Sequence, residues 1–170
     1  SHLHAMFRSL VPLGLPLRGL IERAGRLFCE STLPNHYATL VCGRVTTGGD
    51  VEICNAGHPP PLVVRGNGIA KIATTGLPLG MFCSESYSTE RLQLAPGEAV
   101  VLYSDGFTDA ETRAGEAFGV DRLESYLMRH RGQRAEVLVR QCSDALHAFL
   151  AGAPASDDRT LMAIQRIPSA

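Results

Sequence analysis

Apolar residues recur at helical spacing near the start of the chain. The first stripe comprises Leu3, Met6, Phe7 and Leu10. Steps of three, one and three positions put these side chains on one face of a helix. Pro12 and Gly14 interrupt this helix, and Pro16 suits the first turn of a second one. The apolar face of the second predicted helix comprises Leu17, Leu20, Ile21, Ala24, Leu27 and Phe28.

The middle of the chain changes to short apolar runs separated by turn residues, which is typical of antiparallel strands. Strands are expected over residues 37–45, 51–55, 62–65, 69–73, 87–94, 99–103 and 160–167. Glycine-rich turns at residues 48–50 and 66–68 predict two hairpins. Two further helices are expected around Leu123–Leu127 and Leu138–Phe149. The order helices, strands, helices, strand predicts an α+β fold with an antiparallel core, in one domain spanning residues 1–170.

Charge and composition narrow the function classes. Sixteen basic and 17 acidic residues give a net charge of −1, so the basic excess expected of a nucleic-acid-binding protein is missing. No apolar run reaches the length of a membrane span, and we expect no membrane insertion. The five cysteines include no C-x-x-C pair and several lie in apolar stretches. This usage predicts a reducing cytoplasm rather than a disulfide framework.

Acidic residues follow or precede two predicted core strands. Asp105 and Gly106 come directly after the apolar strand 99–103, and Asp157 and Asp158 come shortly before the last strand. Carboxylates at strand ends can meet and bind Mg²⁺ or Mn²⁺ through oxygen. Each motif alone also has a structural interpretation, because Asp-Gly is a common turn and Asp often caps a loop.

Signatures of other hydrolytic chemistries are absent from the sequence. There is no G-x-S-x-G elbow, no H-E-x-x-H motif and no P-loop. His58 precedes three prolines, which favour an extended, rigid turn. We expect His58 to be structural, with a place at the rim of a site as the alternative.

Five motifs in order resemble the SpoIIE/RsbU branch of the PPM-type (protein phosphatase 2C-like) serine/threonine phosphatases. They are the segments 55–62 (NAGHPPPL), 76–80 (GLPLG), 103–110 (YSDGFTDA), 115–119 (GEAFG) and 157–161 (DDRTL). The resemblance implies a two-layer antiparallel β-sandwich flanked by helices. It also implies two Mn²⁺ or Mg²⁺ ions, with Asp105 and Asp157 as ligands and Asp158 beside them. From their own sequence context, Gly106, which lets the backbone approach a ligand closely, and His58 are placed at the rim of this site.

The same resemblance suggests a biological setting. Substrates in this branch are typically phosphoserine or phosphothreonine on anti-sigma-factor antagonists, and a sensory domain commonly precedes the phosphatase domain. A water molecule activated by the metals would attack phosphorus directly. The expected location is the cytoplasm.

One departure from the family pattern affects the expected activity. The family begins with an Asp-x-x-Gly-His/Lys-Gly motif whose aspartate bridges both metals, and this sequence contains no such motif. We therefore expect the chain to miss the N-terminal metal-binding segment, to bind metal weakly, and to turn over slowly or not at all. The alternative function is a non-catalytic, protein-binding signalling domain, and a third is a different metal hydrolase on the same fold.

Overall fold

The computed structural model describes residues 2–33, 35–154 and 157–167. Contacts between residues divide the chain into two compact units. The first unit comprises Ser1–His58 and Ala73–Gln93, and the second comprises Pro59–Ile72 and Leu94–Ala170. Within the described residues, no helix combines the length and apolar character that crossing a bilayer requires.

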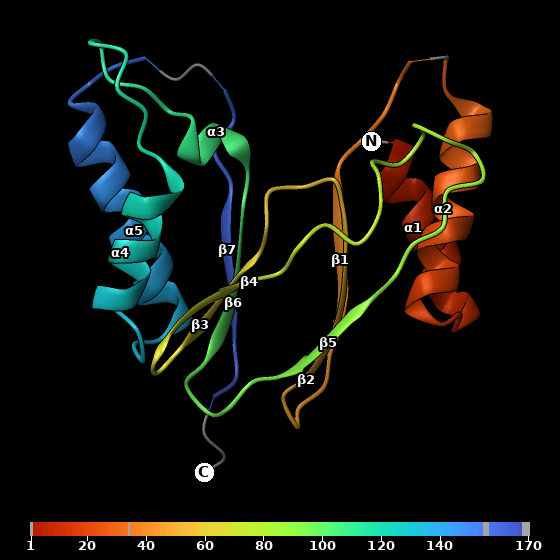
Figure 1. Cartoon of the computed structure of the whole chain (residues 1–170), viewed down its shortest axis with the longest axis horizontal. Coiled ribbons are helices and arrows are strands. Elements are labelled where there is room, and N and C mark those ends of the chain that lie inside the picture. Colours follow the sequence, from red (N-terminus) through yellow and green to blue (C-terminus); the bar gives the residue numbers. More distant parts are fainter. Residues whose placement is uncertain (1, 34, 155–156, 168–170) are drawn as a thin grey trace. The chain divides into compact units, whose positions relative to one another are not determined.

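The first unit consists of two helices, one short 3-10 helix and a three-stranded sheet (Figure 1). Its elements are α1 His2–Leu10, η1 Val11–Leu13, α2 Leu17–Ser31, β1 Leu40–Val45, β2 Asp50–Ala56 and β5 Glu90–Gln93. The sheet order is β1-β2-β5, and both pairings are antiparallel. The predicted hairpin around residues 48–50 is confirmed by the pairing of Val45 with Val51.

The core of the first unit lies between α2 and the sheet. The buried face of α2 includes Leu20, Ile21 and Ala24, which recur at the predicted helical spacing. These residues pack in one cluster with Cys54 and Ala56 of β2. Pro16, expected in the first turn of this helix, is its N-cap residue, and the helix begins at Leu17. Burial of this apolar face, rather than local propensity alone, stabilises the helix.

The second unit consists of a four-stranded sheet and three helices. Its elements are β3 Leu62–Arg65, β4 Gly68–Lys71, β6 Ala99–Tyr103, α3 Asp105–Thr108, α4 Val120–Arg129, α5 Ala135–Leu150 and β7 Leu161–Gln165. The strand order is β4-β3-β6-β7, again antiparallel throughout. The predicted β3–β4 hairpin is confirmed by the pairing of Arg65 with Gly68.

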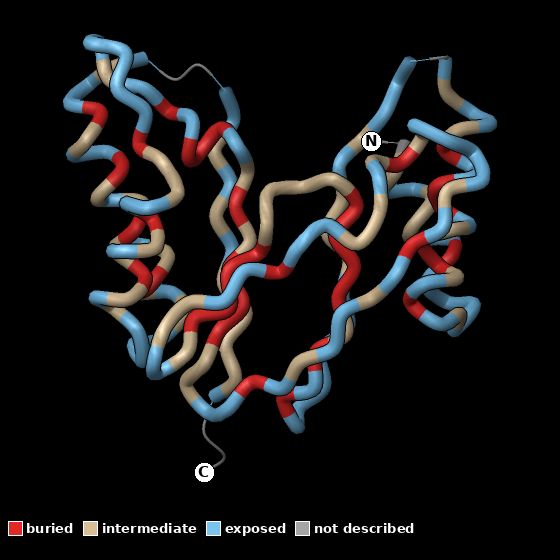
Figure 2. The backbone as a smooth tube through the Cα atoms, in the orientation of Figure 1, coloured by how far each residue is buried: buried red, intermediate tan, exposed pale blue. Residues whose placement is uncertain are grey.

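The helices α4 and α5 contact each other, and α5 also contacts β7 (Figure 1). The buried residues of α5 are Leu138, Cys142, Leu146 and Leu150, which recur every four positions. The strands β3 and β6 are buried along nearly their whole length (red in Figure 2). Phe118 is 1% exposed and packs edge-on against Phe107 and Phe149. This aromatic cluster anchors α3 and α5 in one core.

Three local predictions were wrong. Residues 105–108 form a short helix, α3, where the Asp-Gly sequence indicated only a turn. The strands β1 and β5 are shorter than predicted, since they begin at Leu40 and Glu90. Tyr87, expected to start β5, instead packs with the helix core of the first unit. Tyr87 is therefore a core residue of the first unit and not part of the strand.

The cysteine prediction also needs correction. Cys29 and Cys83 form a disulfide, with Cα atoms 5.4 Å apart, across a sequence separation of 54 residues. The spacing of the cysteines in the sequence does not indicate this disulfide, because only folding brings two such distant residues together. Cys42, Cys54 and Cys142 are free thiols, as expected for cysteines in apolar stretches.

Candidate metal centre

The end of β6 and the start of β7 lie at the same edge of the second unit's sheet. The two strands are antiparallel, and Tyr103, the last residue of β6, pairs with Leu161, the first residue of β7. The residues that follow β6 and those that precede β7 are therefore neighbours. We call residues 104–106 and 157–160 the aspartate edge.

Ser104 joins the two halves of the aspartate edge. Its backbone N–H donates to the carbonyl of Thr160 at 3.0 Å, which extends the β6–β7 ladder by one bond. Its hydroxyl donates to the carbonyl of Asp158 at 3.2 Å and accepts from the N–H of Thr160 at 3.0 Å. Three hydrogen bonds thus hold the segment before β7 against the first turn of α3.

Gly106 allows the closest approach between the two segments. A Cβ atom at this position would lie 2.3 Å from the carbonyl oxygen of Asp158 and 3.2 Å from the Cβ of Asp157. The nearer contact is to backbone, which cannot swing aside like a flexible side chain. Glycine is therefore required by space, and any larger residue would push the Asp157–Asp158 segment away from α3.

The carboxylates at this edge are exposed and only partly hydrogen-bonded. Oδ1 of Asp105 accepts from the N–H of Gly106 at 2.8 Å, and Oδ1 of Asp157 accepts from the N–H of Asp158 at 2.7 Å. Among the described residues, neither second oxygen has a hydrogen-bond partner, and no arginine or lysine pairs with these aspartates. Like charges that lie near one another without an ion pair favour a bound cation.

A hard divalent cation fits this donor set in part. Mg²⁺ commonly keeps several waters and binds through one or two protein carboxylates. Two aspartate side chains with free oxygens satisfy that minimum. Within the part of the chain that the structure describes, no group of three or more histidine, cysteine, aspartate or glutamate side chains is arranged to hold a metal. The edge thus supplies a partial ligand set rather than a closed protein cage.

The predicted site residues do not all belong to one unit. Asp105, Gly106, Asp157 and Asp158 come together at the aspartate edge. His58 belongs to the first unit, where its ring Nδ1 lies 3.1 Å from the hydroxyl of Thr39. Its role at the rim of the site stays a prediction.

The backbone of the turn around His58 is held by a neighbouring side chain. Asn55 is fully buried and accepts from the backbone N–H of His58 at 2.9 Å while donating to its carbonyl at 3.0 Å. Gly57 has φ of +71°, and a Cβ there would lie 2.5 Å from the side chain of Pro78. These contacts link the first two motifs of the family resemblance and explain their residue types.

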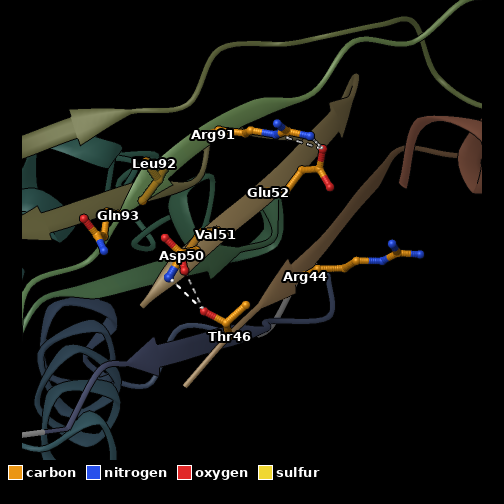
Figure 3. Close-up of a pocket in the computed structure, with 8 residues that line it drawn as sticks. All are labelled: Arg44, Thr46, Asp50, Val51, Glu52, Arg91, Leu92 and Gln93. Atoms are coloured by element: carbon orange, nitrogen blue, oxygen red, sulfur yellow. Dashed lines mark hydrogen bonds and ion pairs between the residues drawn. The ribbon is translucent and has the colours of Figure 1, made fainter. Parts of the chain in front are cut away.

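Sequence reasoning missed a charged surface pocket in the first unit (Figure 3). Its volume is about 610 Å³, and its lining residues come from the β1–β2 hairpin and from β5. They are Arg44, Thr46, Asp50, Val51, Glu52, Arg91, Leu92 and Gln93. Charged and apolar residues alternate along these strands, but that pattern does not show which distant strand pairs with the hairpin.

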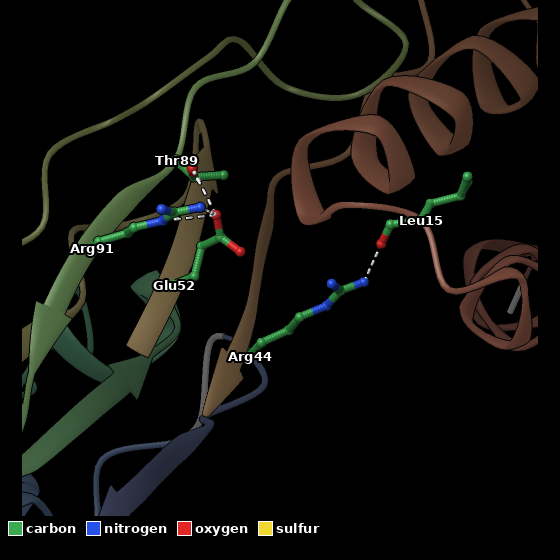
Figure 4. A network of polar contacts seen from close by, with 5 residues as sticks. All are labelled: Leu15, Arg44, Glu52, Thr89 and Arg91. Atoms are coloured by element: carbon green, nitrogen blue, oxygen red, sulfur yellow. Dashed lines mark hydrogen bonds and ion pairs between the residues drawn. The ribbon is translucent and has the colours of Figure 1, made fainter. Parts of the chain in front are cut away.

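The charges that line this pocket have partners (Figure 4). Arg91 pairs with Glu52 at 2.9 Å, Thr89 donates to the same carboxylate, and Arg44 donates to the carbonyl of Leu15. Hydrogen bonding from Arg91 lowers the pKa of the Glu52 carboxyl. Two arginines and two acidic residues line the pocket, so their formal charges sum to zero, unlike those of the aspartate edge.

Antiparallel sheets with helices, together with aspartates at strand ends, define a protein phosphatase 2C-like fold. The structure matches the RsbU and RsbW domains of a Mycobacterium tuberculosis protein with a TM-score of 0.76 and 28% identity, over 98% of this chain and 46% of that chain. It matches the SiaA-PP2C domain of Pseudomonas aeruginosa with a TM-score of 0.78 and 19% identity, over 96% and 67% of the two chains. The predicted fold class is thereby confirmed.

The family model of Stage II sporulation protein E (SpoIIE) matches residues 1–167, and the chain belongs to this family. Protein IcfG of Synechocystis sp. is 31% identical over 134 residues. That alignment covers 76% of this chain and 21% of IcfG. The chain thus spans about a fifth of the length of its curated relative. RsbX, whose structure is in complex with magnesium, matches with a TM-score of 0.67 and 15% identity, over 95% of this chain and 71% of that chain.

Proposed function

We propose that residues 1–170 act as one metal-dependent serine/threonine protein phosphatase domain. The observation that carries the proposal is the close approach of Gly106 to Asp157 and Asp158, which holds two acidic segments together although no ion pair joins them among the described residues. Membership of the SpoIIE family supports a phosphatase rather than another metal hydrolase. The fold alone would not make that distinction.

The proposed cofactor is Mn²⁺ or Mg²⁺, with Asp105 and Asp157 as ligands and Asp158 beside them. The magnesium complex of RsbX supports this choice. When bound, the cations would offset the charge of the phosphate and make a water molecule acidic enough to act near neutral pH. Asp105 would orient one carboxylate oxygen outward, because its other oxygen accepts from Gly106. Asp157 would do the same through its bond with Asp158.

The proposed substrate is phosphoserine or phosphothreonine on a signalling protein such as an anti-sigma-factor antagonist. The similarity to RsbU and RsbW domains supports a place in such a signalling system. We further propose a cytoplasmic location and a sensory domain in the longer protein.

Activity of these 170 residues alone is proposed to be low. The sequence has no Asp-x-x-Gly motif to bridge two metals, and the aspartate edge supplies only part of a ligand set. The same observation favours a second candidate, a non-catalytic signalling domain that binds a phosphorylated partner.

The test is Mn²⁺-dependent release of phosphate from p-nitrophenyl phosphate and from a phosphoserine peptide. The phosphatase proposal predicts slow hydrolysis that EDTA abolishes and that Asp105→Asn removes, whereas Asp144→Asn leaves it unchanged. Asp144 is an exposed residue of α5, so it controls for the loss of one surface charge. Hydrolysis that is undetectable at every metal concentration would favour the non-catalytic candidate.

A further inference from the structure

A small pocket lies between α5 and the start of β7 in the second unit. Its volume is about 230 Å³, which is smaller than the usual range for drug-sized ligands. Its lining residues are Phe107, Ser143, Leu146, His147, Arg159 and Leu161. We call this cavity the Arg159 pocket. It has room for a single small group.

Arg159 carries buried donors with no acceptor. Its Nε and Nη2 atoms are inaccessible to solvent, and no hydrogen-bond partner for either occurs among the described residues. Arginine is charged at all physiological pH values, so the charge cannot be lost to relieve its burial. Leaving such donors unsatisfied is costly, and a buried charge is normally paired. Because the side chain as a whole is only half-buried, a rotation that turns these two atoms toward the pocket would let an anion there satisfy both donors.

The geometry of the unpaired atoms narrows the kind of anion. The N–H bonds of Nε and Nη2 lie in the guanidinium plane and point outward along the same edge, and this edge binds two oxygens of a carboxylate or phosphate at once. The ring of His147, an exposed residue of α5, can donate to a third oxygen. A carboxylate has only two oxygens, which the arginine uses, whereas a phosphate has more.

The remaining wall of the pocket strengthens this interaction. Phe107, Leu146 and Leu161 are apolar, so an ion pair here is screened less than one at the surface. The hydroxyl of Ser143 donates to the carbonyl of Val139 at 2.9 Å and is already committed. Arg159 is therefore the main donor to a bound anion.

We propose that the Arg159 pocket is a binding site for a phosphate group. It is distinct from the metal ligands, although Arg159 and Phe107 are each two residues from a proposed ligand. The inference goes beyond the proposed phosphatase activity, because binding through Arg159 requires no metal. The phosphate comes either from a phosphorylated protein or from the free ion.

Phosphate binding is measured on the whole 170-residue protein in EDTA, so that any metal-dependent binding is excluded. Inorganic phosphate at constant ionic strength should raise the Tm of the wild-type protein. Arg159→Gln should lose this shift, and Arg159→Lys should bind at least about tenfold more weakly, because lysine lacks the paired donors. Arg140→Gln, an exposed arginine of α5 with no hydrogen bond or ion pair among the described residues, is the matched control and should respond like the wild type.

A shift that persists in Arg159→Gln, or that is absent from the wild type, overturns the proposal. Amide NMR shifts of the wild-type protein on phosphate addition serve as a second readout if Arg159→Gln does not fold. They should change at residues 143–147 and 159–161, and changes confined to other regions would equally refute the site. Because no metal is present, this failure would leave the phosphatase proposal untouched.

Two further binding measurements distinguish a phosphorylated protein from the free ion as the source of the phosphate. A phosphoserine peptide that binds more tightly than inorganic phosphate assigns the pocket to a phosphorylated protein. Equal or tighter binding of inorganic phosphate assigns it to the free ion. The unphosphorylated peptide should not bind, and binding equal to that of the phosphopeptide would contradict a phosphate site.

Discussion

The charged pocket of the first unit and the aspartate edge of the second unit differ in how their charges are balanced. In the pocket, Glu52 pairs with Arg91, and Arg44 donates to a carbonyl. At the aspartate edge, no cation among the described residues pairs with Asp105 or Asp157. Balanced charges of the first kind stabilise a surface locally. Unpaired charges of the second kind add no such stabilisation, and local inconsistencies of this type are expected at functional sites.

The largest effect is expected in the aromatic core that supports the aspartate edge. Phe118 is 1% exposed, whereas Phe82 in the first unit is 59% exposed. Phe118→Ala should lower the free energy of unfolding by about 3–5 kcal/mol, because it leaves a cavity beside Phe107 and Phe149. Phe82→Ala should change it by less than about 0.5 kcal/mol. Urea denaturation measures both, and equal losses would contradict the assigned cores.

The next effect concerns two glycines, one in each unit. Gly106→Ala should cost about 1–3 kcal/mol of stability and weaken Mn²⁺ binding, since its Cβ would collide with the backbone of Asp158. At Gly19 of α2, an added Cβ would meet no atom within 4 Å, so Gly19→Ala should raise stability by about 0.5–1 kcal/mol. Urea denaturation and metal titration test the pair. If Gly106→Ala changed neither the stability nor the Mn²⁺ affinity, the two acidic segments would not be held together by this contact.

A smaller effect depends on pH and involves the buried thiol of α5. Burial raises the pKa of Cys142 from 9.0 to about 12, so the folded protein favours the neutral thiol. Its contribution to stability is complete below pH 9.0 and is lost as the pH rises toward about 12. The wild type should therefore lose stability more steeply than Cys142→Ala in this window, by less than about 1.4 kcal/mol per pH unit. Urea denaturation across this pH range measures the difference. If the stability of both proteins fell equally with pH, the raised pKa of Cys142 would be refuted.

The smallest effect is expected in the neutralised pocket of the first unit. Glu52→Gln should lower stability by about 0.2–1 kcal/mol at low salt, and by less at high salt, because its partner Arg91 is largely exposed. Since Arg91 lowers the pKa of Glu52, the contribution is present above pH 4.5 and fades as the pH falls. Thermal unfolding at two salt concentrations measures it. A loss that does not depend on salt would contradict an ion-pair origin.

Much of the fold was predictable because its signals are local. The helical stripe of α2 and the apolar run Ala99–Tyr103 depend on periodicity, which the sequence displays directly. The neighbouring positions of Asp105 and Asp157 followed from acidic residues at strand ends. Three features depend on contacts between distant residues and could not be predicted. They are the Cys29–Cys83 disulfide, the charged pocket and the unpartnered donors of Arg159.

The central claim is that Asp105 and Asp157 together bind a divalent cation, and calorimetric titration with Mn²⁺ tests it most directly. The account predicts that Asp105→Asn and Asp157→Asn each weaken binding at least about tenfold, while Asp144→Asn binds like the wild type. Mn²⁺ affinity that is the same in all four proteins would contradict it.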